Sequence, residues 1–187
     1  MSTQVKGAVL LARRVYVIKR FGDAGWQRVI EGLPERSRST VEGNLLSTRW
    51  YPFSVNLDLD TTIVEILGGG HDGVFKAIGA ASASENLGGP HRPFLAPGNP
   101  ELFLSRTASI YSFYYDVGHR DYEATGPTSG TMTTFGGETA SKTDCLTVIG
   151  WYEEALKMCG AIRVEMVEES CRANGDPYCR YQISWSM

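Results

Sequence analysis

Hydrophobic positions in the first half of the chain recur at helical spacing. Residues 7–19 carry apolar side chains that do not alternate cleanly, which favours a helix over a strand. Asp23 is a suitable N-cap for a second helix, and Pro34 ends it. The apolar group at residues 53–67 again has helical spacing. The first half is therefore predicted to be mainly helical.

The second half combines helical and alternating patterns. Residues 102–118 predict one helix with many aromatic side chains. Residues 119–125 and 130–135 predict two strands, joined by the Gly-Pro-Thr-Ser turn at residues 126–129. A further helix begins near Cys145, with Thr143 or Asp144 as its cap.

The last 26 residues predict a β-hairpin. In its first strand Met166 and Glu168 share the mainly apolar face, and in its second strand Cys179 and Tyr181 share one face. Asn-Gly-Asp-Pro at residues 174–177 is typical of a turn, because Asn and Gly tolerate positive φ and Pro fixes its own φ. The buried face of this hairpin therefore presents a carboxylate and a thiol.

These elements predict an α+β fold of a single domain, residues 1–187. Residues 1–92 form a mainly helical part, and residues 93–187 form the core that carries the cysteines. The N-terminal helices are expected to pack on a four-stranded antiparallel sheet in the order β-β-α-β-β.

The cysteines are the first candidate chemistry. Three thiols and one inward carboxylate converge if the helix begun by Cys145 lies across the hairpin. Such a sulfur and oxygen donor set, closed at four ligands, favours tetrahedral zinc. The predicted ligands are Cys145, Glu168, Cys171 and Cys179. Inert buried thiols and a disulfide are the alternatives, and Cys159 is expected to be core.

The C-terminal motif resembles a known family. The E-x-x-C-x7-C ending, with Gly-Asp-Pro-Tyr inside it and Cys145 upstream, is similar to the 4-vinyl-reductase domain, above all to its version in phenol-sensing bacterial regulators. The resemblance covers roughly residues 93–187. It implies a structural zinc bound by the same four residues and a regulatory role in bacteria. The opening Val5-Lys6-Gly7 and Gly22-x3-Trp26 resemble the wider superfamily of haem nitric-oxide-binding domains and TRAPP vesicle-tethering subunits.

Composition narrows the partners. The net charge is −3, and 42% of the residues are hydrophobic, without a basic stripe or a disordered tail. No nucleic acid is expected as a partner. The sequence has no recognisable signal peptide, no apolar run long enough for a membrane span and no Asn-x-Ser/Thr site. We therefore predict a reduced, cytoplasmic location.

Two short motifs mimic enzymes. Asp58-Leu59-Asp60-Thr61-Thr62 resembles the nucleophile loop of haloacid-dehalogenase-type phosphotransferases, but the downstream lysine and acidic pair are not apparent. Asp60 is instead expected to cap a helix. Residues 68–73 fit G-x-G-x-x-G without a following ribose-binding acid, so a hinge between helices is favoured over a nucleotide site.

The predicted function is a small-molecule sensor, because four protein ligands leave zinc no open position for catalysis. A cavity for a small aromatic or acyl ligand is expected between the helical part and the sheet, along the aromatic helix, with Trp50, Phe53 and Leu57 covering its other side. Its predicted lining comprises Phe94, Tyr111, Tyr114, Phe135, Trp151 and Tyr152.

Three alternatives accompany this prediction. A haem gas sensor would need an axial ligand from His71, His91 or His119, and the Tyr-x-Ser-x-Arg propionate motif is absent. A protein-interaction scaffold needs no ligand. A reductase would need a flavin or nicotinamide site, which the sequence does not show, so no enzyme activity is expected. Signal output is expected through a homodimer or a partner protein.

Overall fold

The first half of the chain folds into helices, as its periodicity predicts. The structure is a computed structural model that describes residues 3–89, 91–136 and 141–187. Two short strands, β1 (Gln4–Lys6) and β2 (Trp50–Pro52), pair antiparallel with each other, and this half of the chain also contains four helices. These helices are α1 (Gly7–Gly32), α2 (Glu35–Glu42), α3 (Phe53–Ile66) and α4 (Val74–Gly88).

The two helices predicted before Pro34 are present as two helical segments of α1. α1 runs through residues 7–32, and Gly22 interrupts it with the non-helical angles φ 72° and ψ 177°. Only glycine adopts this conformation without steric cost. Asp23 directly follows this break, at the start of the second segment, as the sequence predicts.

The second half contains the remaining helices and the main sheet. Its strands are β3 (His119–Gly126), β4 (Ser129–Phe135), β5 (Arg163–Ser170) and β6 (Cys179–Ser186). Its helices are α5 (Pro100–Leu104), α6 (Thr107–Tyr114) and α7 (Lys142–Met158), with short 3-10 turns η1 (Arg92–Phe94) and η2 (Arg172–Asn174). α7 is capped by the Ser141 side chain, which accepts from the Asp144 amide at 3.1 Å, and not by Thr143 or Asp144.

The single helix predicted over residues 102–118 is divided. Arg106, between α5 and α6, has non-helical φ −90° and ψ 3°. Its guanidinium donates to the carbonyl groups of Pro93, Phe94 and Leu95 at 3.3, 3.0 and 3.1 Å. These contacts to a distant loop fix the break, which helical periodicity alone does not reveal.

The four-stranded sheet confirms the predicted α+β class and the β-β-α-β-β order. Its strands lie antiparallel in the order β3-β4-β6-β5, so the last strand occupies an interior position. On β6 the odd-numbered residues 179–185 are buried and the even-numbered ones are more exposed, which confirms the predicted alternation.

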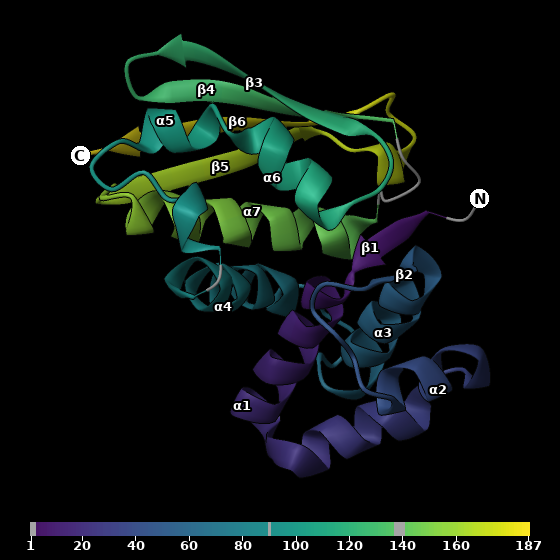
Figure 1. Ribbon diagram of the computed structural model, residues 1–187. Coiled ribbons are helices and arrows are strands. Elements are labelled where there is room, and N and C mark those ends of the chain that lie inside the picture. The colour runs from purple at the N-terminus through teal and green to yellow at the C-terminus, as the bar shows by residue number, and fades with distance from the viewer. Residues whose placement is uncertain (1–2, 90, 137–140) are drawn as a thin grey trace.

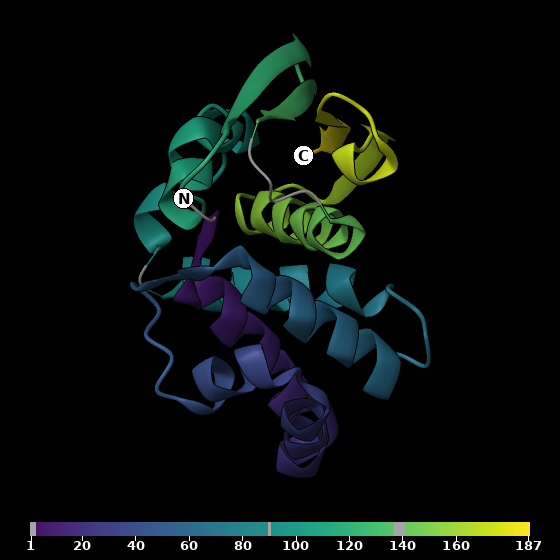
Figure 2. The ribbon, with the colours of Figure 1, turned by 90° about the vertical axis from the view of Figure 1, so that its right-hand side faces the viewer.

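The layers differ from the prediction in one respect. α7 lies against the sheet, α5 and α6 flank it, and α4 packs along the far side of α7 (Figure 1, Figure 2). α1, α2 and α3 lie beyond α4. The N-terminal helices therefore reach the sheet mainly through α7, because that helix already occupies the face that the prediction gave to them.

α4 and α7 cross with their backbones in contact. A Cβ atom added at Gly79 would lie 2.1 Å from the Thr147 carbonyl oxygen, and one added at Gly150 would lie 1.9 Å from that of Lys76. Both distances are far inside van der Waals contact, so only glycine allows this approach. The crossing joins the helical half to the half that contains the sheet.

The buried side chains form two clusters. One, around Leu10, Leu59 and Ile63, lies among the N-terminal helices. The other, around Phe103, Tyr152 and Tyr181, lies between α7 and the sheet. Among the described residues, no helix combines the length and the apolar character needed to cross a bilayer.

Candidate metal centre and ligand cavity

Three buried cysteines meet where the first turn of α7 faces the end of the C-terminal hairpin. Cys145 Sγ lies 3.5 Å from Cys171 Sγ and 3.7 Å from Cys179 Sγ. All three sulfur atoms are within 4.8 Å of one another, and each residue is at most 4% exposed. The structure therefore brings together three of the four predicted metal ligands in a group that could hold a metal ion.

The loop between Cys171 and Cys179 is held by hydrogen bonds within the loop, from backbone amides to side-chain atoms. Asp176 Oδ2 accepts from the Cys171 amide at 2.8 Å, and Gly175 adopts φ 96°, as the Asn-Gly-Asp-Pro sequence predicts. The Arg172 amide donates to Cys179 Sγ at 3.4 Å. This loop orients Cys171 and Cys179 toward Cys145.

Glu168 faces the same side of the sheet as the cysteines. It pairs with Tyr181 across β5 and β6, and a bulge follows at residues 168–170. Its Oε1 atom is buried without a hydrogen-bond partner. The carboxylate lies outside the tight group of three sulfur atoms. An orphaned buried carboxylate oxygen beside three thiols suits a cation, since such an oxygen is costly to bury unpaired.

The sulfur spacing suits tetrahedral coordination. A tetrahedral site with zinc-sulfur bonds of about 2.3 Å separates its sulfur atoms by about 3.8 Å, close to the two distances given above. The Cys145 thiol donates to Cys179, which lowers the pKa of Cys179 to about 6 and raises that of Cys145. A thiolate is therefore favoured at this centre near neutral pH, and thiolate is the form that binds metal. Cys159, also buried, lies outside this group.

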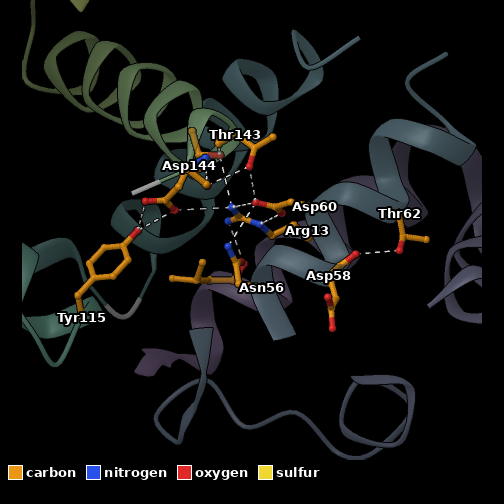
Figure 3. Close-up of polar contacts among 11 residues, drawn as sticks. Arg13, Asn56, Asp58, Asp60, Thr62, Tyr115, Thr143 and Asp144 are labelled. Atoms are coloured by element: carbon orange, nitrogen blue, oxygen red, sulfur yellow. Dashed lines mark hydrogen bonds and ion pairs between the residues drawn. The ribbon is translucent and has the colours of Figure 1, made fainter. Parts of the chain in front are cut away.

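A buried ion network connects α1 and α3 with the first turn of α7 (Figure 3). Arg13 of α1 is 1% exposed and donates to both oxygens of Asp60 on α3, at 2.9 and 3.2 Å. Thr143 and Asn56 also donate to Asp60 Oδ2, at 3.0 and 3.3 Å. Burial lowers the pKa of Arg13, but Asp60 raises it overall. Asp60 is thus the buried partner of a guanidinium in mid-helix, and its prediction as a helix cap is wrong.

Asp144 extends this network to the aromatic side chains. Its two oxygens accept from the Tyr115 hydroxyl at 3.0 and 3.1 Å, and Oδ1 lies 3.9 Å from Arg13. Burial raises the pKa of Asp144 to about 6, partly offset by Arg13. The first turn of α7 therefore carries a network residue, Asp144, directly before the metal-ligand candidate Cys145.

The other carboxylate of the Asp58-Leu59-Asp60 motif points elsewhere. Asp58 accepts from Arg36 at 2.6 and 2.8 Å and from the Ser37 hydroxyl at 2.6 Å. The Arg36 guanidinium lowers the pKa of Asp58. The two carboxylates have separate structural partners, which agrees with the sequence argument against a phosphotransferase site.

A small cavity lies between α1, α4, α6, α7 and β3. Its volume is about 50 Å³, and its lining includes four of the six predicted residues: Tyr111, Tyr114, Trp151 and Tyr152. Val9, Ile110 and Val148 supply apolar walls, and Arg120 adds a buried cation. The location agrees with the prediction. The volume is far below the roughly 300–1,000 Å³ of drug-sized ligand pockets, because the aromatic rings pack together.

Phe94 and Phe135 are not among the residues that line this cavity. Phe94 packs against Phe113 and His91, whereas Phe135 stacks on His119. Of the three residues predicted to cover the far side, Phe53 and Leu57 belong to the same hydrophobic cluster as Tyr152 but do not line the cavity. Trp50 instead lies under the Lys6 ammonium, 3.8 Å from its ring centroid.

Sequence reasoning missed Arg13, Arg120 and Asp144. Arg13 interrupts an apolar helical stretch, and a charged residue on such a face signals a buried partner. Arg120 follows His119 in an alternating strand, where its inward position could be inferred from the period of two. Their partners lie far away in the sequence.

None of the three histidines lines the cavity. His71 and His119 are exposed. His91 is half-buried, and its Nδ1 lies 2.8 Å from the hydroxyl of the lining residue Tyr114. Burial lowers the pKa of His91.

The sequence matches no protein-family model and no curated protein sequence. The structure is similar to that of an H-NOX protein from K. algicida in the unliganded Fe(II) state, with TM-score 0.75, 17% identity and 97% of each chain covered. It is also similar to an H-NOX protein from S. oneidensis in the Fe(II)NO state, with TM-score 0.71, 14% identity, and coverage of 97% of this chain and 99% of that one.

These similarities show that the chain has the H-NOX fold over nearly its whole length. They agree with the wider superfamily that the N-terminal residues predict. The narrower resemblance to the 4-vinyl-reductase domain stays a prediction that rests on the cysteine motif.

Proposed function

We propose that this protein is a sensory module that binds a small ligand in the cavity and is stiffened by a structural zinc ion. The observation that carries the proposal is the position of the cavity, which is lined by α1 and α4 on one side and by α6, α7 and β3 on the other. A ligand there contacts both halves of the molecule, so its binding can change how they pack.

Helix α7 connects the cavity to the metal centre. Cys145, Val148 and Tyr152 are spaced three and four residues apart and therefore lie along one helix face. Val148 and Tyr152 line the cavity, and Cys145 is the metal-ligand candidate. Movement of α7 by a ligand is thereby transmitted to the metal-bound hairpin.

Zinc is the metal that the donor set favours. Three thiolates and the Glu168 carboxylate would complete a tetrahedral site, and such a closed site serves structure because it leaves no position for substrate. The expectation that the chain is not an enzyme follows from this. The zinc would join α7 to the β5-β6 hairpin.

Haem sensing is the second candidate, and the H-NOX fold favours it. The residues in the cavity do not fit haem. The volume of about 50 Å³ is too small, and no His, Cys or Met is among the described residues that line it. Burial raises the pKa values of the lining phenols Tyr114 and Tyr115, which disfavours phenolate ligation.

Native mass spectrometry of protein purified without chelator tests these proposals together. We expect one zinc ion per chain. A metal-free protein with reduced cysteines would contradict the zinc proposal. The mass of a haem adduct, together with a Soret band in the absorbance spectrum, would replace our proposal with the haem alternative, provided that His91→Ala loses the haem.

The native mass spectrum also reports the oligomeric state. We keep the homodimer as a proposal, supported by exposed apolar side chains on or beside the edge strand β5: Ile162 is 72% exposed and Val167 is 51% exposed. A monomer at tens of micromolar would indicate that the output passes through another protein. Binding by a small ligand should then change the affinity for that partner.

A further inference from the structure

Arg120 is a buried cation that makes no direct ion pair with the described residues, and Asp144 acts on it only from beyond ion-pair distance. It is 5% exposed, and its Nε donates to the Thr134 hydroxyl at 2.8 Å. Within residues 3–89, 91–136 and 141–187, no carboxylate oxygen lies within 4.0 Å of its guanidinium. Arg13, equally buried, binds Asp60 through two nitrogens. Since arginine stays charged at every physiological pH, Arg120 keeps a charge in a low-dielectric site where no carboxylate pairs with it directly.

Aromatic rings compensate Arg120 only in part. Its guanidinium carbon lies 4.8 Å from the ring centroid of Tyr111 and 5.6 Å from that of Tyr152. Such cation-π contacts offset only part of the cost of burying an ion. Both rings line the same cavity as Arg120. They leave the rest of the guanidinium's hydrogen-bonding capacity for another group.

Tyr152 adds a second unsatisfied group to this cavity. The residue is 1% exposed, and its hydroxyl lies near the Arg120 guanidinium but makes no hydrogen bond of good geometry with the described residues. A buried hydroxyl without such a bond is destabilising. The cavity therefore contains a forked cationic donor and a hydroxyl donor, surrounded by the apolar side chains of Val9, Ile110 and Val148.

We propose that the cavity binds a small carboxylate, held by the Arg120 guanidinium and the Tyr152 hydroxyl. A planar pair of oxygens matches the fork of arginine, and the apolar walls suit a methyl group. A cavity needs about 10–15 Å³ of this kind of volume for one water molecule, so about 50 Å³ holds roughly three to five non-hydrogen atoms. Formate and acetate have this size, whereas the predicted aromatic ligand would require the rings to move apart.

This inference rests on the proposed function, because it assumes that the cavity is the ligand site. It changes the expected ligand class from apolar or aromatic to anionic. It also gives Arg120 a role in the signal. Arg120 lines a second cavity of about 20 Å³ together with Cys145 and Cys179, so an anion bound to it lies near the metal centre as well.

The test is calorimetric titration of the metal-loaded full chain with sodium acetate and with sodium formate, with sodium chloride as the ionic-strength control. We expect saturable binding of at least one carboxylate. Tyr152→Phe removes one charge-assisted hydrogen bond and should weaken binding about tenfold or more. This variant should fold, since the hydroxyl it removes makes no hydrogen bond of good geometry with the described residues. Arg120→Lys keeps the charge but loses the fork, and should also weaken binding.

Tyr122→Phe is the matched control. The Tyr122 hydroxyl donates to Glu101 at 2.6 Å, and the residue does not line the cavity. It should leave carboxylate affinity unchanged. Equal weakening by Tyr122→Phe and Tyr152→Phe would overturn the assignment, because it would show a general effect on stability.

Neutral probes separate this inference from the proposed function. If acetamide binds as tightly as acetate, and Arg120→Lys does not change either affinity, the cavity is a ligand site but does not select anions. The inference of a carboxylate ligand would then be wrong. Binding of phenol without binding of any carboxylate would also overturn the inference and keep the sensor. No binding of acetate, formate, acetamide or phenol would overturn both.

Discussion

The cysteine centre and the Arg13–Asp60 network are neighbours with opposite designs. Cys145 and Cys179, the outermost cysteines of the centre, are 34 positions apart, and a hairpin and the start of one helix bring its residues together. The ion network joins Arg13 to Asp60, 47 positions away, and Asp60 to Thr143, 83 positions away. The cysteine centre is a local motif that can be recognised in the sequence, whereas the ion network becomes apparent only in the folded chain.

The two centres meet on the first turn of α7. Thr143 and Asp144 contact the ion network, and Cys145 belongs to the group of three cysteines. The comparison teaches that one helix end ties the N-terminal helices and the C-terminal hairpin together through two different chemistries. Disturbing either centre should therefore affect the other half of the molecule.

The largest expected effect is loss of a metal ligand. Structural zinc contributes about 10 kcal/mol or more to folding in small zinc domains, so Cys145→Ala and Cys179→Ala should each lower the unfolding free energy by more than about 5 kcal/mol. Cys159→Ala should cost much less, because it removes only a small buried thiol. Denaturant unfolding of the zinc-loaded proteins measures this difference. Equal losses in all three variants would leave core packing as the explanation.

Breaking the ion network should have the next largest effect. Arg13→Met leaves Asp60 charged and buried, which should cost about 3–5 kcal/mol. Arg36→Met removes the partner of Asp58, but Arg36 is exposed to solvent, so this loss should be much smaller than that of Arg13→Met. The double variant Arg13→Met/Asp60→Leu should recover part of the first loss. A similar cost for Arg13→Met and Arg36→Met would show that burial does not distinguish the two pairs.

The glycine crossing should be sensitive to a single methyl group. Gly150→Ala places a Cβ against the Lys76 carbonyl and should cost about 1–3 kcal/mol or more. Gly73→Ala is the matched control, because a Cβ there meets nothing within 4 Å. It should be neutral or stabilise by about 0.4–1 kcal/mol. Thermal unfolding gives both values, and a stable Gly150→Ala protein would contradict the close approach.

The smallest effect concerns pH. Burial lowers the pKa of His91 below its ordinary value of 6.5, so the unfolded chain binds more protons in the range just below 6.5. The stability contributed by neutral His91 should be complete above about pH 6.5 and decrease as the pH falls toward the folded pKa. His91→Gln should flatten that part of the stability profile. An unchanged slope in the variant would assign it to other groups.

The sequence predicted most of the fold because its signals were local. Alternation along residues 179–185 and the turn at Gly175 determine the hairpin, and three of its four proposed metal ligands follow from that geometry. The break at Arg106 was missed because it depends on carbonyl groups of a separate loop. The role of Asp60 was missed for the same reason, since its partner lies on another helix.

The cavity shows the same limit in another form. Tyr111 and Tyr152 were predicted as lining residues because aromatic side chains gather on two helices. The volume they enclose depends on how the rings pack against Arg120, which no periodicity describes. The position of the cavity was therefore predictable, and its size and charge were not.

The crossing of α4 and α7 also offers a criterion for finding distant relatives. Gly79 and Gly150 lie in different helices, and at each position the backbone of the other helix leaves no room for a side chain. A protein that keeps this fold and this interhelical distance must have glycine at both positions, whatever its ligand or metal. Paired glycines at these two places, even in chains without the cysteines, would identify homologues that have lost the cysteine group and kept this close packing of the two helices.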